Sequence, residues 1–143
     1  MYAKSWGNYP KIKSNIIKYN KNKRIKEIIK NNNNLITYGN GGSYGDSALG
    51  PNIILRKKKD KIISFEKKSG ILNVEAGVQL SDILNKFVPK GWFLKVTPGR
   101  KYITVGGAIA SDVHGKNHHI DGCFSETLKE FKIILPNGNL VSC

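Results

Sequence analysis

Glycines gather in two short segments, and these constrain the fold of this chain more than any other feature. In the first, four glycines occupy the seven positions from Gly39 to Gly45, directly after a predicted strand. Glycine permits positive φ angles and close approach of a ligand, and successive exposed N–H groups form a concavity that binds anions. Ser43 and Ser47 add hydroxyl groups, so the segment is expected either to cradle a diphosphate or to form a tight turn. It lacks the Lys-Ser/Thr of a P-loop and the Rossmann spacing, which disfavours nucleoside triphosphates and NAD.

The second segment, residues 97–119, combines glycine with other small residues. Thr104 is expected to cap a short helix near Val105, with Gly106 and Gly107 in its first turn. A helix N-terminus offers unpaired N–H groups and a partial positive charge, which favour a phosphate. Small residues that would let a flat ring or another backbone approach closely are Gly107, Ala108, Ala110 and Ser111. The alternative is a tightly packed core helix with a glycine turn.

Short predicted strands dominate the rest of the chain. Apolar and β-branched runs predict strands over 35–38, 52–56, 62–65, 71–75 and 92–96, and an alternating run over 127–135 precedes a hairpin turn at Asn137-Gly138. Amphipathic helices are expected over 20–30 and from Gln79 or Ser81 to about Val88. Short strands, few helices and no regular βαβ alternation predict an α+β fold rather than a doubly wound Rossmann sheet.

The chain is strongly basic, with a formal net charge of +14 and a pI near 9.9. Such a balance raises nucleic acid as a partner. However, only three of the 24 basic residues are arginines, which are the favoured residues for bidentate contacts with phosphates and bases. Abundant Lys and Asn are typical of an AT-rich genome. A solvated basic surface is therefore expected, and no nucleic-acid partner.

The expected location is the cytoplasm. Two cysteines, Cys123 and Cys143, are too few for a disulfide framework. The longest apolar runs span only a few residues, which excludes a transmembrane helix, and the first residues have no apolar signal core. Attraction of the basic chain to an anionic substrate or to a membrane surface, as a peripheral protein, stays open.

Together the two segments resemble a family of FAD-dependent oxidoreductases. Residues 39–46 read Gly-Asn-Gly-Gly-Ser-Tyr-Gly-Asp, where the family usually has Gly-x-Gly-Arg-Ser-Tyr-Gly-Asp. Residues 98–118 contain Pro-Gly, then Thr-Val-Gly-Gly-Ala-Ile-Ala-Ser-Asp-Val-His-Gly-Lys-Asn-His in the family order. The chain is similar to the vanillyl-alcohol oxidase family with its PCMH-type FAD-binding domain, and most similar to the decaprenylphosphoryl-β-D-ribose 2-oxidase subgroup. Residues 6–10 and 135–138 also look like family features, so the resemblance covers nearly the whole chain.

The resemblance implies FAD bound by a two-subdomain α+β domain that is incomplete at its C-terminus. Residues that match the first loop would wrap the pyrophosphate: Thr37, Tyr38, Gly39, Asn40, Gly41, Gly42, Ser43, Tyr44, Gly45, Asp46 and Ser47. Residues of the second segment would line the rest of the dinucleotide: Gly99, Thr104, Val105, Gly106, Gly107, Ser111, Asp112, Val113 and His114. Lys116 matches a family lysine near the substrate, and Tyr44 lies near the flavin and substrate side. The catalytic residues stay unknown.

One position departs from the family pattern. Gly42 stands where the family usually has an arginine, so the pyrophosphate environment lacks one cation. In covalent flavin oxidases of the superfamily a histidine occupies that position. Because glycine cannot form such a bond, the resemblance implies noncovalent FAD, and the missing arginine bears on affinity rather than on fold.

Several other side chains admit competing interpretations. Six potential metal ligands lie within twelve residues: Asp112, His114, His118, His119, Asp121 and Cys123. Their spacing matches no zinc pattern, and no metal site is expected. His114 can be a general base or, preferably, a hydrogen-bonded structural residue beside the cofactor. Lys116 can bind an anionic phosphate or stabilise developing negative charge, or be one surface lysine among 21.

By resemblance, the full-length protein would oxidise an alcohol group of a sugar, polyol or polyprenyl-phosphate-linked sugar by hydride transfer to FAD, and a separate reductase would act with it. Residues 15–75 are expected to form the first subdomain and residues 76–143 the start of the second. The substrate domain would follow residue 143, so the isolated chain is expected to bind FAD weakly or fold poorly, without turnover. The alternatives are a stand-alone FAD- or nucleotide-binding module that needs a second polypeptide for catalysis, and a basic nucleic-acid-binding protein.

Overall fold

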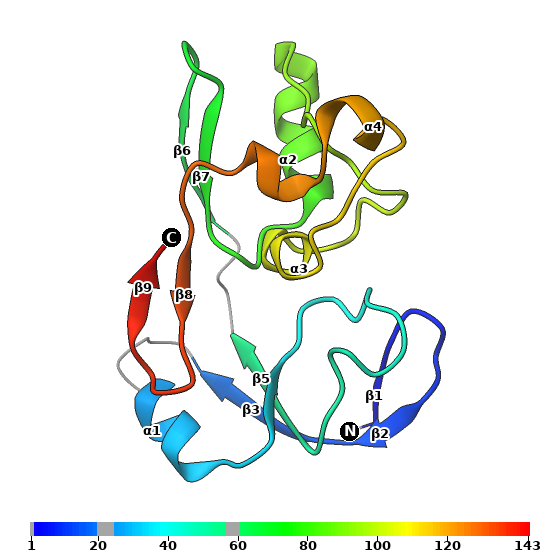
Figure 1. Cartoon of the computed structure of the whole chain (residues 1–143), viewed down its shortest axis with the longest axis vertical. Helices are drawn as coiled ribbons and strands as arrows, with labels where there is room; N and C mark the ends of the chain where they lie inside the picture. Colours follow the sequence, from blue (N-terminus) through cyan, green and yellow to red (C-terminus); the bar gives the residue numbers. More distant parts are fainter. Residues whose placement is uncertain (1, 20–24, 57–60) are drawn as a thin grey trace. The chain divides into compact units, whose positions relative to one another are not determined.

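The computed structural model describes residues 2–19, 25–56 and 61–143 (Figure 1). They belong to two compact units: unit 1 comprises residues 1–57 and 128–143, and unit 2 comprises residues 58–127. Short strands and short helices occur in both units, and the predicted α+β class is confirmed. The subdomain boundary that the sequence places near residue 75 stays a prediction.

A three-stranded parallel sheet forms part of unit 1. It consists of β3 (Asn15–Tyr19), β4 (Leu35–Thr37) and β5 (Asn52–Arg56) in the order β3-β5-β4, and α1 (Ile25–Asn31) connects β3 to β4 (Figure 1). Central β5 carries Ile53, which is 1% exposed and packs with Ala3 and Leu49. The predicted strand 35–38 is only half-buried, because β4 lies at an edge of the sheet. Residues 20–24 of the predicted helix lie outside the described residues.

Two antiparallel hairpins complete unit 1. One pairs β1 (Tyr2–Lys4) with β2 (Lys11–Lys13), and the other pairs β8 (Lys132–Ile134) with β9 (Leu140–Ser142). The predicted turn at Asn137-Gly138 is confirmed: Gly138 has φ +79° and its N–H donates to the Leu135 carbonyl at 2.8 Å. The sequence showed no period before residue 20, so β1, β2 and β3 were not predicted.

Unit 2 combines one hairpin with short helices. Its elements are β6 (Ile62–Glu66), β7 (Ile71–Val74), α2 (Leu80–Phe87), the 3-10 helix η2 (Val88–Lys90), α3 (Val105–Ala110), α4 (His118–Asp121) and the 3-10 helix η3 (Phe124–Thr127). The predicted apolar face of α2 is confirmed, because Leu80, Ile83 and Phe87 are all buried. The Phe87 ring lies 4.7 Å from that of Phe65 on β6.

Residues 92–96 form no strand, so that prediction is wrong. Apolar residues of this run pack through their side chains and do not pair in a sheet. Trp92 meets the ring of Phe65 edge-on at 5.2 Å, and Val96 is 1% exposed. The strand expected over 127–135 is likewise shorter and is limited to β8. Across the three described ranges, no helix has the length and apolar character needed to cross a membrane.

Candidate functional site

The first glycine-rich segment lies in unit 1 and starts where β4 ends. Tyr38 extends the pairing with β5 by one residue, since its N–H donates to the Ile54 carbonyl at 3.2 Å. Its hydroxyl donates to the Lys4 carbonyl at 2.8 Å. Gly41 has φ +63°, and a Cβ atom there would collide with the Tyr38 hydroxyl and lie 2.9 Å from the Lys4 carbonyl oxygen. Position 41 therefore requires glycine for both conformation and space.

The loop that follows uses its carbonyl groups for local structure. The carbonyl of Ser43 accepts from the Trp6 N–H at 3.1 Å, and that of Asp46 accepts from the Leu49 N–H at 2.7 Å. The Ser47 hydroxyl donates to the Tyr44 carbonyl at 2.9 Å. In contrast, the backbone N–H groups from Gly41 to Asp46 donate no hydrogen bond to any residue that the structure describes. This row of donors is the feature that an anion requires.

The second segment lies in unit 2, where α3 has the predicted cap. The Thr104 hydroxyl oxygen accepts from the Gly107 N–H at 3.1 Å. The expectation of unpaired N–H groups at this helix end is wrong. The N–H of Val105 donates to the Val78 carbonyl and that of Gly106 to the Ala76 carbonyl, each at 2.8 Å. Residues 76–78 run beside the start of the helix, and their carbonyl groups accept hydrogen bonds from its first N–H groups. The N-terminus of α3 therefore offers no free row of N–H groups to a phosphate.

Glycine at position 106 makes this arrangement possible. A Cβ atom there would lie 3.1 Å from the Ala76 Cβ and 3.2 Å from its carbonyl oxygen. The backbone of residues 76–78 therefore approaches α3 closely at Gly106. Gly107 and Ser111 remain exposed, so one side of the short helix stays accessible to a flat ligand.

Residues after α3 are held by local hydrogen bonds. The Asp112 carboxylate accepts from the Ser125 N–H at 2.9 Å, and the Val113 carbonyl accepts from the Phe124 N–H at 2.9 Å. His114 pairs with Cys123 as an isolated antiparallel bridge. Asp112 thus has a structural role here, whereas the imidazole of His114 is exposed.

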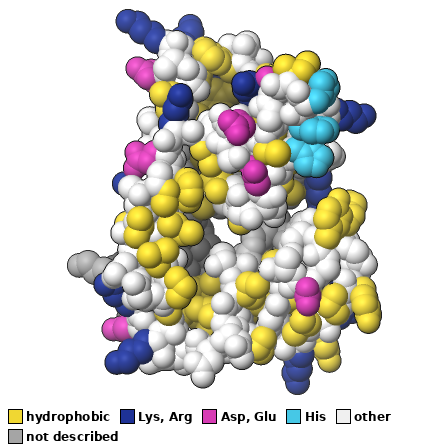
Figure 2. Space-filling model, in the orientation of Figure 1, with side chains coloured by type: hydrophobic (Ala, Val, Ile, Leu, Met, Phe, Trp, Pro, Cys, Tyr) yellow, Lys and Arg dark blue, Asp and Glu magenta, His cyan; other side chains and the backbone are white. Residues whose placement is uncertain are grey.

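Three histidine side chains gather on one face of unit 2, shown in cyan in Figure 2. The rings of His114 and His118 lie 5.1 Å apart, and those of His118 and His119 lie 6.0 Å apart. Among the described residues, no three His, Cys, Asp or Glu side chains are placed to hold a metal ion. Both aspartates of the sequence cluster, Asp112 and Asp121, have other hydrogen-bond partners.

A cavity of about 430 Å³ adjoins Gly99. Phe93 and Tyr102 border it, with 68% and 53% of their surface exposed, and Leu80 and Leu84 of α2 contribute an apolar wall. The side chains of Arg100 and Lys101 also line it, and Lys101 Nζ lies 5.4 Å from the centre of the Tyr102 ring. Apolar and aromatic groups beside two cations suit a planar ring that carries negative charge. A larger cavity of about 620 Å³ lies between β6 and α2 and contains none of the predicted site residues.

The structure thus places the predicted site residues in two sets. Residues 37–47 belong to unit 1, whereas Gly99, residues 104–107, residues 111–114 and Lys116 belong to unit 2. Tyr44 is 80% exposed and Lys116 is exposed. Asn117 belongs to the second motif but has no role that the sequence predicted, although its amide joins two segments of unit 2.

Comparison with known protein families identifies the class of protein. A family model described as an FAD binding domain matches residues 20–143. The match covers most of the chain, and the chain therefore belongs to this family of FAD-binding domains. FAD is its cofactor, and the resemblance drawn from the two glycine-rich segments is confirmed.

Individual relatives are oxidoreductases by name. The chain is 36% identical over 108 residues to decaprenylphosphoryl-beta-D-ribose oxidase of Mycolicibacterium smegmatis. The aligned region covers 74% of this chain and 24% of the relative. The chain is 29% identical over 84 residues to D-lactate dehydrogenase of Anaerostipes hadrus, covering 59% of this chain and 18% of the relative. A putative D-arabinono-1,4-lactone oxidase of Neurospora crassa is 30% identical over 84 residues, covering 59% and 15%. The chain spans about a quarter or less of each of these relatives.

Proposed function

We propose that this chain is the FAD-binding part of an oxidoreductase that oxidises an alcohol group of a sugar, polyol or polyprenyl-phosphate-linked sugar. The names of three relatives support this substrate class, because a ribose, a lactate and a sugar lactone all contain hydroxyl-bearing carbons. FAD would supply the hydride acceptor. The chain's own residues would bind and orient the cofactor and one side of the substrate.

The loop of unit 1 carries this proposal. Its N–H groups from Gly41 to Asp46 have no acceptor among the described residues, and glycines at positions 41 and 45 have φ +63° and +55°. A diphosphate would provide the missing acceptors, and the overall charge of +14 would favour the anion. Because Gly42 has no side chain that could be alkylated, the FAD would be held noncovalently at this position.

The predicted residues of unit 2 would act mainly through shape. Since the first N–H groups of α3 are already bonded, we propose that Gly107 and Ser111 contact the dinucleotide through their small exposed surfaces. The cavity at Gly99, with the exposed Tyr102 ring at its border, would accept a planar ring system. His114 would lie beside the cofactor as a hydrogen-bonding residue.

Two exposed side chains would face the substrate. The Lys116 ammonium would bind an anionic group or stabilise negative charge that develops during oxidation. The Tyr44 hydroxyl would donate to or accept from a substrate hydroxyl. A lipid-linked sugar would also bring this basic chain to a membrane surface, where anionic lipids attract lysines. A partner reductase would then act on the keto product.

The visible absorption spectrum of the purified chain, after addition of FAD and removal of the excess, tests the proposal. Flavin bands should appear, weakly from this chain and more strongly from a chain extended to the length of its relatives, and should move into the supernatant after acid precipitation. Bands that stay in the precipitate would contradict noncovalent binding. The absence of flavin bands, both from this chain and from a chain extended to the length of its relatives, would contradict FAD binding itself.

A further inference from the structure

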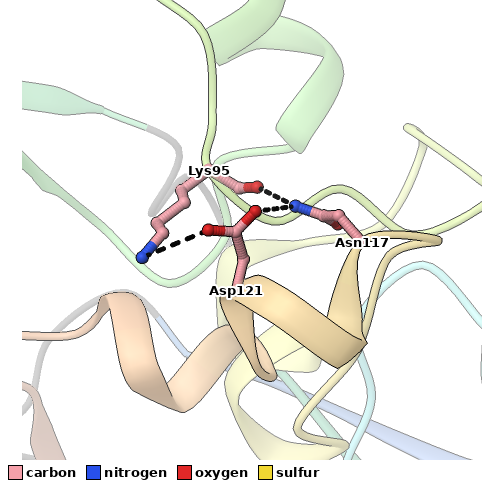
Figure 3. A network of polar contacts seen from close by, with 3 residues as sticks. All are labelled: Lys95, Asn117 and Asp121. Atoms are coloured by element: carbon pink, nitrogen blue, oxygen red, sulfur yellow. Dashed lines mark hydrogen bonds and ion pairs between the residues drawn. The ribbon is translucent and has the colours of Figure 1, made fainter.

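Asn117 connects two segments of unit 2 that are far apart in the sequence (Figure 3). Its Nδ2 donates to the carbonyl of Lys95 at 3.0 Å and to Oδ2 of Asp121 at 2.7 Å. Asn117 is the N-cap of α4, where asparagine ordinarily accepts a hydrogen bond from the helix backbone. Here the side chain makes no such cap bond. The amide therefore joins α4, through Asp121, to a main-chain carbonyl 22 residues earlier in the chain.

The backbone beside Asn117 is packed without spare room. Gly115 is buried, and a Cβ atom at that position would lie 2.9 Å from the carbonyl oxygen of Thr97 and 2.5 Å from Asn117 Oδ1. Gly115 is thus enclosed by the backbone of the segment 95–97 and by the Asn117 side chain. Residues 115–117 and 95–97 form one junction, two residues before Gly99.

The ion pair in the same network has a supporting role. Lys95 Nζ lies 3.5 Å from Asp121 Oδ1, and the two side chains are 60% and 31% exposed. A pair with this exposure contributes little by itself because water screens it. The two interactions use different oxygens of the Asp121 carboxylate, since Oδ1 faces Lys95 and Oδ2 accepts from Asn117. The acceptor on Lys95 is a main-chain carbonyl, so it persists whatever side chain stands there.

We propose that Asn117 is a positioning residue that fixes Lys116 and the segment leading into Gly99 relative to each other for FAD and substrate binding. This role rests on the proposed function. Lys116 stands between Gly115, which is enclosed, and Asn117, which is tied to Lys95, whereas its own side chain is exposed. Its Cα position is consequently fixed on both sides while the ammonium remains accessible. Asn117 acts through these neighbours and needs no contact with the cofactor.

The test compares Asn117→Ala with three matched variants of the full chain. Asn85→Ala removes an exposed amide of α2, Lys95→Ala retains the main-chain acceptor, and Asp121→Asn retains an oxygen acceptor. Two quantities are measured: amide hydrogen exchange of peptides covering 113–119, without FAD, and the dissociation constant of added FAD, from quenching of flavin fluorescence. Both are measured without urea, at a temperature at which circular dichroism shows that every variant is folded.

In Asn117→Ala, the amides of residues 113–119 should exchange about tenfold faster, and FAD should bind about tenfold more weakly. The three other variants should stay within about threefold of the parent chain for both quantities. Asn117→Asp, which cannot donate to either oxygen, should behave like Asn117→Ala, and Asn117→Gln should not recover the geometry fully because its amide stands one bond further out. Combining Asn117→Asp with Asp121→Asn restores one of the two hydrogen bonds and should recover part of the loss.

The two readouts separate the two proposals. If the parent chain and its extended form bind no FAD, the proposed function fails and so does any positioning role toward FAD. If FAD binds and Asn117→Ala matches Asn85→Ala in affinity, the positioning role is overturned while the proposed function stands. Parent-like exchange over 113–119 in Asn117→Ala would overturn the junction itself.

Discussion

Replacing Gly115 with alanine should destabilise unit 2, and the structure gives the size of the effect. The added Cβ would lie 2.9 Å from the Thr97 carbonyl oxygen, a backbone atom that cannot rotate away, and 2.5 Å from Asn117 Oδ1. Overpacking of this kind costs about 1–3 kcal/mol. Because φ at this glycine lies outside the left-handed region, alanine also reduces the entropy of the unfolded chain, which offsets about 0.4–1 kcal/mol. The expected net loss in the free energy of unfolding is about 1–2 kcal/mol.

Urea denaturation followed by circular dichroism measures this loss. With a slope of about 2 kcal/mol per molar urea, the midpoint should fall by roughly 0.5–1 M. Gly99→Ala, measured without FAD, is the matched control in the same unit, since nothing lies within 4 Å of its added Cβ. Its midpoint should stay the same or rise slightly. If Gly115→Ala proved as stable as Gly99→Ala, the tight junction between residues 95–97 and 115–117 would be refuted.

Three further substitutions test single features of the two segments. Thr104→Ala removes the acceptor of the Gly107 N–H and should lower the free energy of unfolding by about 1 kcal/mol, with Thr104→Ser largely restoring it in the same urea assay. Gly45→Ala introduces a side chain into open space but at φ +55°, so backbone strain alone should cost about 1–2 kcal/mol, and Gly45→Asn should cost less. Gly42→Arg supplies the cation that the family resemblance implies; FAD affinity by fluorescence titration should increase at low salt and the gain should shrink at 1 M salt. An equal gain at both salt concentrations would contradict an electrostatic origin.

Much of the local structure could be read from residue types. Asn-Gly predicted the turn between β8 and β9, and the spacing of apolar residues predicted the buried face of α2. The threonine before Val105 was correctly expected to cap α3. These features depend on contacts within a few residues, where propensity and hydrogen-bonding capacity act directly. The strands β1 and β2 escaped prediction because each spans only three residues, too short a run for its alternation to be distinguished from a loop.

The same limit appears in the candidate site. The glycine pattern of residues 39–45 indicated a loop suited to an anion, and the described structure leaves its N–H groups from Gly41 to Asp46 available. The pattern at residues 104–107 indicated a helix N-terminus that would suit an anion equally well. Which partner satisfies those donors depends on residues 76–78, which lie more than twenty-five positions earlier in the chain. Nothing near Val105 in the sequence reveals that the donors are already used.

The sequence by itself determined the family, the cofactor and the position of both glycine-rich segments, because these depend on residue identities in fixed order and on the backbone freedom of glycine. Only the tertiary structure decided which donors remain open, that residues 92–96 are packed rather than paired, and that Asn117 ties its loop to Lys95. The physical reason is that hydrogen-bond satisfaction and close packing are set by neighbours in space. Those neighbours are brought together by folding and not by adjacency along the chain.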